Sequence, residues 1–78
     1  MPHLPELRRR EALALLDHLG IGYRVGRSGS IVGRTRAGAP FTLHAHDSEA
    51  MFRAKVAKFL KQAGITEAEF WIWYNGTS

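Results

Sequence analysis

The sequence predicts an α+β domain, a two-layer α-β-β-β-α sandwich, and three observations lead to this fold class. A helical pattern of apolar residues stands near each end of the chain, and three short segments with alternating apolar and polar residues lie between them. Loops that contain glycine separate these segments, which is typical of antiparallel hairpins. The 78 residues suffice for a single domain, 1–78, and a hydrophobic fraction of 45% suits a globular core.

Two amphipathic helices are expected, over residues 5–19 and 48–63. Pro5 suits the first position of a helix, where its missing N–H costs nothing. Gly64 directly follows the second helix and can end it as a C-terminal cap. The expected core stripe of the second helix consists of Phe52, Val56, Phe59, Leu60 and Ala63.

Three strands are expected between the helices, over residues 21–27, 30–36 and 41–46. Side chains alternate between the two faces of a strand, so each segment can be divided by face. The apolar face, which the helices would cover, consists of Ile21, Tyr23, Val25, Ile31, Phe41, Leu43 and Ala45. The opposite face consists of Arg24, Arg34, Arg36, Thr42, His44 and His46, with Val32 as an apolar exception. The sequence therefore predicts a sheet with one open, basic face.

The last segment, residues 66–75, has two interpretations. A T-x-x-E sequence that starts at Thr66 has the form of a helix capping box. The run F-W-I-W-Y that follows consists of strand-forming residues. The balance favours a capped turn that leads into a fourth strand, with one short helix as the alternative. A small domain can hardly bury both faces of such a strand, so we expect Trp71, Trp73 and Tyr74 to contact a partner protein or a second copy of the chain. Burial in the chain's own core and stacking on nucleic-acid bases are the alternatives.

The net charge is +4, and its distribution along the chain is uneven. Residues 1–46 carry seven arginines and three acidic side chains, whereas residues 47–78 carry four basic and four acidic side chains. Arginine presents a planar fork that matches phosphate, so a basic chain of this size is a candidate for nucleic-acid binding, with solubility charge as the alternative. The expected contacts to nucleic acid are Arg24, Arg34, Arg36, His44 and His46.

The chemistry of a ribonuclease is the one enzymatic activity that these residues offer. His44 and His46 stand two residues apart, and histidine can serve as general base and acid near neutral pH. Arg34 and Arg36 can stabilise the charge that develops on a phosphate. With Asp47, the two histidines can also supply zinc ligands, but zinc sites use three or four ligands and the chain has no cysteine. We therefore expect no metal and no cofactor.

Two further expectations come from composition. No run of about 18 apolar residues is present, so we expect no membrane span. The absence of cysteine suits a reducing compartment, and we expect a cytoplasmic protein.

The element order and the stretch FLKQAGITEAEF at residues 59–70 resemble the HicA family of small toxins. A Leu-Gly pair at 19–20 and a Gly-Ser pair at 29–30 stand at separations that fit the family. The resemblance implies a minimal double-stranded-RNA-binding fold, an mRNA interferase activity and an antitoxin-like protein partner of the HicB type. The family's catalytic histidine follows the Gly-Ser pair, and here that position is Ile31, which cannot transfer a proton. The family's activity is therefore not carried over to this position.

Two functions of different classes follow. The first is a small RNA-binding protein of HicA-like fold. The second is a non-catalytic inhibitor or regulator of the phage type that binds another protein through its aromatic C-terminal segment. A third alternative places the three-stranded sheet in a groove of DNA.

Overall fold

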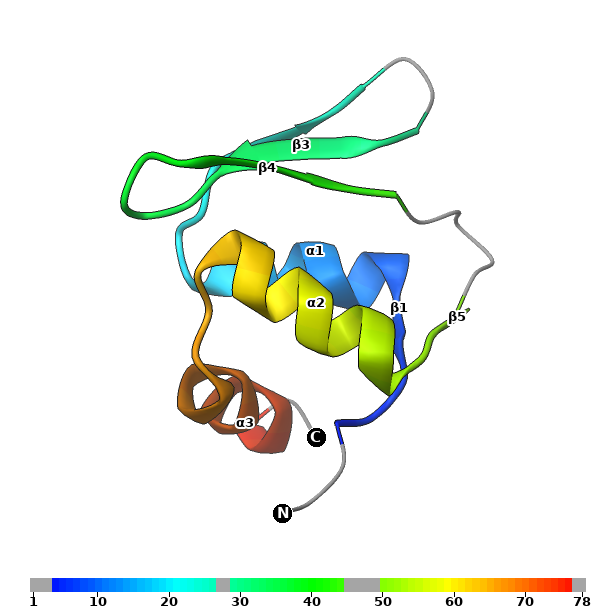
Figure 1. Ribbon diagram of the computed structural model, residues 1–78. Helices are drawn as coiled ribbons and strands as arrows, with labels where there is room; N and C mark the ends of the chain where they lie inside the picture. Colours follow the sequence, from blue (N-terminus) through cyan, green and yellow to red (C-terminus); the bar gives the residue numbers. More distant parts are fainter. Residues whose placement is uncertain (1–3, 27–28, 45–49, 77–78) are drawn as a thin grey trace.

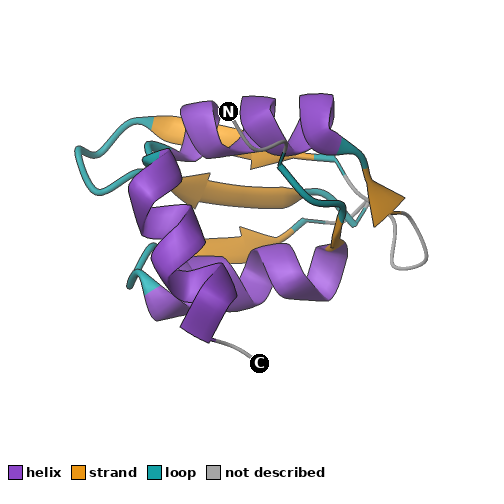
Figure 2. Ribbon diagram, turned by 90° about the horizontal axis from the view of Figure 1, so that it is seen from below, coloured by secondary structure: helices purple, strands orange, loops and turns teal. Residues whose placement is uncertain are grey.

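The computed structural model describes residues 4–26, 29–44 and 50–76. Within these residues, three helices and two antiparallel sheets make up the α+β fold that the sequence predicts. A three-stranded sheet forms one layer, and helices α1 (Arg9–His18) and α2 (Arg53–Ala63) cover one of its faces (Figure 1). Helix α3 (Glu67–Gly76) lies on the side of this helix pair away from the sheet, and Figure 2 shows it across one end of α1 and α2.

The three-stranded sheet has the order β2-β3-β4, with β2 at Tyr23–Val25, β3 at Ile31–Arg34 and β4 at Pro40–Leu43. Ile31 lies opposite Val25 on one side and Leu43 on the other, so these side chains share a face. Ile31 and Leu43 are buried against the helices, whereas Val25, at the end of the sheet, is 52% exposed. The division into an inward apolar face and an outward polar face is thereby confirmed within β2, β3 and β4, with Val25 as an exposed exception. Ala45, also predicted on the apolar face, lies outside the described residues.

Gly33 leaves room for the buried ring of Phe41. It pairs with Phe41 in the register, and a Cβ atom added at Gly33 would lie 2.7 Å from Phe41 Cζ. The same Cβ atom would lie 2.6 Å from the carbonyl oxygen of Gly22. Because one neighbour is backbone and the other is a buried ring, the close-packed interior cannot accept even a methyl group here.

A second, short sheet ties the two ends of the fold together. Strand β1 (Leu7–Arg8) pairs antiparallel with β5 (Ala50–Met51), and Leu7 lies opposite Met51. Both side chains are fully buried. This pairing joins the residues just before α1 to those just before α2.

The first helix is shorter than expected, because it begins at Arg9 instead of Pro5. The residues before it form β1, and strand pairing with a distant segment outweighs their local helical pattern. The N–H of Arg8 donates to Glu11 Oε1 at 2.8 Å, which satisfies one backbone donor at the start of α1.

The second helix begins at Arg53, five residues later than expected. Phe52, predicted to belong to the core, precedes the helix and is 65% exposed, so that prediction is wrong. Gly64 ends the helix in the left-handed conformation, at φ +72°, as expected. The rest of the predicted stripe is buried, namely Val56, Phe59, Leu60 and Ala63.

The C-terminal segment is a helix, so the favoured fourth strand is wrong and the alternative is confirmed. The capping box is complete. Thr66 N–H donates to Glu69 Oε1 at 3.0 Å, and Glu69 N–H donates to Thr66 Oγ1 at 3.1 Å. Phe70 and Trp73, three residues apart, share the buried side of α3. A satisfied helix start and an apolar pair at helical spacing thus outweigh the strand propensity of the aromatic run.

We predict that Gly33→Ala lowers the free energy of unfolding by about 1–3 kcal/mol, because the methyl group overpacks the space next to Phe41. Urea denaturation measures this loss. Gly22→Ala is the matched control, since a Cβ atom at Gly22 meets nothing within 4 Å. Equal stability of the two variants would contradict the packing described for Phe41.

Candidate nucleic-acid interface

The outward face of the sheet carries two arginines close together. Arg24 of β2 lies opposite Val32 of β3, and Val32 lies opposite Thr42 of β4. Arg34 stands two residues after Val32 on the same face, where it is a diagonal neighbour of Arg24. Arg24, Arg34 and Thr42 are exposed. The predicted open face therefore carries two of the three expected arginines, with Val32 between Arg24 and Thr42.

No carboxylate neutralises these arginines from the strands themselves. The sequence contains no acidic residue between Asp17 and Asp47, a stretch that includes all three strands. Arg34 Nη1 donates to the carbonyl oxygen of Gly38 at 3.1 Å, which positions its guanidinium group beside the β3–β4 turn. A face with cations and no acidic side chain has a positive potential that attracts phosphate.

This face is hollowed, and the hollow continues toward the edge of the sheet. The first hollow, of about 370 Å³, is lined by Gly22, Tyr23, Arg24, Val32, Gly33, Arg34 and Pro40. Pro40 also lines a second hollow, of about 560 Å³, together with Phe41, Thr42, His44 and Gln62. Because β4 is an edge strand of the sheet, this second hollow leads from the open face around that edge.

A third hollow, of about 150 Å³, extends the surface onto α2. Thr42, His44 and Gln62 line it as they line the second hollow, and Lys55 and Lys58 of α2 join them. The two lysines and Gln62 follow the spacing i, i+3, i+7, which places them on one face of a helix. The three adjoining hollows are called the basic surface below.

Lys55, Lys58 and Gln62 are not among the site residues that the sequence predicts. Their helical spacing identifies a shared polar face, but that face gains a role only because α2 packs beside β4. Contact between segments so far apart in the sequence has no local signature.

His44 is the histidine that the structure places in the basic surface. Its Nδ1 lies 3.0 Å from Ser30 Oγ, and this hydrogen bond orients the ring at the end of β4. His46, the second predicted catalytic residue, lies outside the described residues. Ile31, at the position of the HicA-family histidine, is fully buried under the sheet and does not reach the basic surface.

Arg36 does not belong to the open face, so this part of the prediction is wrong. It follows β3 in a turn closed by hydrogen bonds between Thr35 and Ala39, where strand alternation no longer applies. Its guanidinium group forms a bidentate ion pair with Glu69, and Nη2 also donates to the carbonyl oxygen of Gly64 at 2.9 Å. Arg36 therefore joins the β3–β4 turn to the start of α3.

The Arg36–Glu69 pair changes the acidity of the carboxyl group. The hydrogen bond from Arg36 is the largest cause that lowers the pKa of Glu69 from 4.5 to about 2, and the hydrogen bond from the Thr66 N–H is the second. Because both side chains remain partly exposed, at 42% and 28%, the ion pair is of the surface kind and contributes modestly to stability.

The aromatic residues predicted to form a protein interface differ in their accessibility. Trp73 is buried at 7% exposure, Trp71 is half-buried, and Tyr74 is 37% exposed. Because this segment is a helix, the three side chains point in different directions around its axis and do not alternate between two faces as they would on a strand. Ile72 is the most exposed residue of this segment, at 72%.

The described part of the chain has neither a metal-binding cluster nor a membrane-spanning helix. No group of three or more His, Cys, Asp or Glu side chains there can hold a metal ion. His46 and Asp47, two of the three side chains considered for zinc, lie outside the described residues. No helix in residues 4–26, 29–44 and 50–76 is both long enough and apolar enough to cross a bilayer.

No protein-family model matches the chain, and no curated protein or solved structure matches it either.

We predict that Glu69→Gln destabilises the protein at neutral pH and has no effect near pH 2. The pKa of Glu69 is lower in the folded chain than in the unfolded chain, so the ionised carboxylate stabilises the fold. This stabilisation is complete above about pH 4.5 and disappears as the pH falls toward 2. Urea denaturation at several pH values measures this change. Glu67→Gln is the control, because Glu67 makes no ion pair or hydrogen bond within the described residues. A pH-independent difference between wild type and Glu69→Gln would contradict the ion pair.

Proposed function

We propose that the protein binds RNA through the basic surface. The observation that carries this proposal is the pair Arg24 and Arg34 on an open sheet face that contains no carboxylate. Each arginine offers a fork of donors to a phosphate, and neutralised phosphates release counterions, which drives binding without regard to base sequence.

The length of the basic surface suits a chain of phosphates. It leads from Arg24 and Arg34 past Pro40 to His44 at the sheet edge, and then to Lys58 on α2. Cations therefore stand at both ends of the surface, and its middle is apolar or neutral. This arrangement is typical of a site that follows a nucleic-acid backbone.

The preference for RNA over DNA rests on two points. Thr42, His44 and Gln62 place hydroxyl, imidazole and amide groups beside the cations, and such groups can hydrogen-bond to the ribose 2′-hydroxyl. The resemblance of residues 19–20, 29–30 and 59–70 to HicA proteins adds a family that acts on RNA.

Binding without cleavage is the activity that these residues support best. The family's catalytic position is a buried isoleucine, Ile31. Within the described residues, His44 is the one histidine that lines the basic surface. In-line cleavage of RNA without metal commonly uses both a base and an acid, and one histidine supplies a single such group.

The double variant Arg24→Ala/Arg34→Ala is expected to weaken binding to a short RNA by about tenfold or more at low salt. The slope of log K against log salt should also fall, by about 0.7–0.9 for each lost phosphate contact. Fluorescence anisotropy at several salt concentrations measures both quantities. The control is Arg53→Ala/Lys61→Ala, which removes two exposed cations of α2 that do not line the basic surface. Equal losses in both double variants would indicate general charge attraction and contradict the assigned face.

His44→Ala is expected to weaken RNA binding about two- to threefold, since it removes one hydrogen-bonding group from the middle of the surface. Wild type and variant, incubated with RNA without metal, should both leave the RNA intact on a denaturing gel. Cleavage by the wild type that disappears in His44→Ala would contradict binding without turnover and make His44 catalytic.

A further inference from the structure

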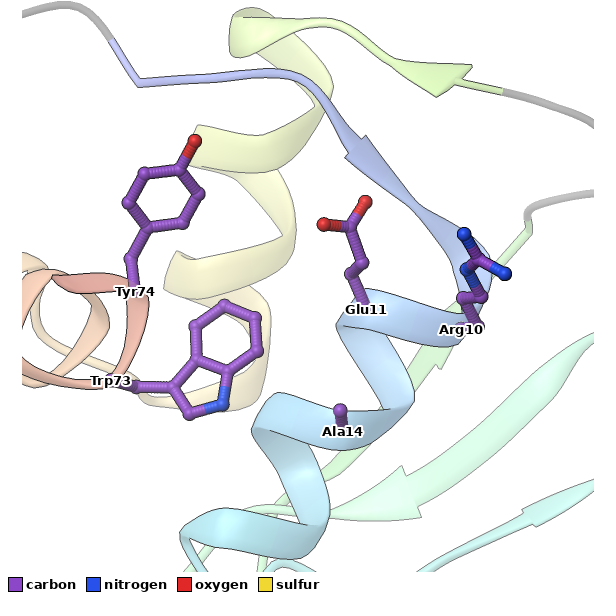
Figure 3. Close-up of a pocket in the computed structure, with 5 residues that line it drawn as sticks. All are labelled: Arg10, Glu11, Ala14, Trp73 and Tyr74. Atoms are coloured by element: carbon purple, nitrogen blue, oxygen red, sulfur yellow. The ribbon is translucent and has the colours of Figure 1, made fainter. Parts of the chain in front are cut away.

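A separate cleft lies between α1 and α3 (Figure 3). Figure 1 shows α3 on the side of the helix pair away from the sheet. Its volume is about 630 Å³, within the range of sites that bind ligands or peptide segments. Arg10, Glu11 and Ala14 of α1 line one wall, and Trp73 and Tyr74 of α3 line the other. None of these residues belongs to the basic surface.

The aromatic wall is held in place by ring contacts within α3. Tyr74 stacks on the fully buried Phe70, with ring centroids 5.6 Å apart and planes inclined by 18°. Trp73 contacts the same Phe70 ring at 6.0 Å and the Tyr74 ring at 6.4 Å. Because Phe70 anchors both rings, this wall is preformed; Tyr74 supplies most of its accessible surface, and the buried Trp73 lies behind it.

A carboxylate faces these rings from the opposite wall. Glu11 Oε1 accepts the hydrogen bond from the Arg8 N–H, which fixes the side chain, and Oε2 makes no hydrogen bond within the described residues. In Figure 3 the carboxylate of Glu11 lies across the cleft from Tyr74, and Arg10 lies on the far side of Glu11 from the two rings.

We propose that this cleft receives an arginine or lysine side chain from a partner protein. Aromatic faces attract cations, and the facing carboxylate of Glu11 supplies the opposite charge. An apolar occupant would strip water from Glu11 without compensation, and a phosphate would be repelled by it. Helix α3 adds no basic residue to this wall. Arg10 also lines the cleft, but it lies on the far side of Glu11 from the rings in Figure 3, so the carboxylate is the charge nearer to them. Size and charge therefore favour a short peptide segment with a cation at its centre.

The probe for this proposal is a short Gly/Ser peptide with one central arginine, compared with the same peptide containing citrulline. Citrulline keeps the shape of arginine and lacks its charge. The indole N–H signal of Trp73 is followed by NMR on the full chain, and its assignment comes from Trp71→Phe, since the protein has two tryptophans. The arginine peptide is expected to shift this signal saturably in the millimolar range, and the citrulline peptide to bind at least several-fold more weakly.

Two charge-matched variants test the role of the carboxylate. Glu11→Gln retains an oxygen that accepts from the Arg8 N–H, so the start of α1 is preserved, but it removes the charge from the cleft. We expect it to weaken the arginine peptide about two- to fivefold. Glu6→Gln removes an exposed carboxylate that does not line the cleft, and should leave affinity unchanged.

Three results would overturn the proposal. They are the absence of a saturable shift of the Trp73 indole with the arginine peptide, equal affinity for the two peptides, and equal effects of Glu11→Gln and Glu6→Gln. If RNA shifts the Trp73 indole signal and the arginine peptide does not, the proposal is also overturned, and the cleft is assigned to nucleic acid. Because the cleft and the basic surface share no residue, RNA binding by Glu11→Gln reports on the proposed function separately.

Discussion

The burial of Ile31, Phe41 and Leu43 between the sheet and the helix pair determines where the side chains of the three strands point. A sheet with helices on one face alternates strictly, so burying these three residues forces Arg24, Arg34 and Thr42 outward. A register shift of one residue would place guanidinium groups in the core without partners, at a cost far above the stability of a small domain. Gly33 completes this packing, because a side chain at its position would displace the Phe41 ring. The geometry of the proposed RNA site is thus a consequence of core packing.

The same architecture separates two surfaces of different character. Arginine and lysine border the open face and the β4 edge, whereas aromatic rings and Glu11 line the cleft between α1 and α3. The helix pair stands between the sheet and α3 (Figure 1), so a ligand on the open face leaves the cleft accessible. The burial of Phe70 and Trp73 holds α3 to the rest of the fold, with a smaller contribution from the Arg36–Glu69 ion pair, and keeps the aromatic wall in place opposite α1. An RNA and a protein partner could therefore be bound at the same time.

The parts of the fold that sequence predicts well are those with a strong local pattern. The helical stripe from Val56 to Ala63 and the alternation around Ile31 each identify a buried face without knowledge of the partner element. The pairing of Leu7 with Met51 has no such pattern, because it depends on two segments that meet only in the folded chain. The helical stripe in the sequence also includes Phe52. In the structure, β5 occupies the residues just before it and α2 begins only at Arg53, so Phe52 is exposed.

The candidate site shows the same division. Arg24 and Arg34 follow from alternation within regular strands. Arg36 does not, because β3 ends at Arg34 and an acceptor 33 residues further along the chain, Glu69, captures the guanidinium group. In the C-terminal segment, the capping box competes with a strand-forming sequence, and the helix wins because Phe70 and Trp73 can then be buried together.

The most direct measurement is an NMR titration of the full chain with a short single-stranded RNA, in which the backbone amide signals are followed residue by residue. If the basic surface binds RNA, the largest shifts fall on β2, β3 and β4 and on the face of α2 that carries Lys55 and Lys58, while α3 changes little. Shifts concentrated on α1 and α3, with the signals of Arg24, Val32 and Arg34 unmoved, would contradict it.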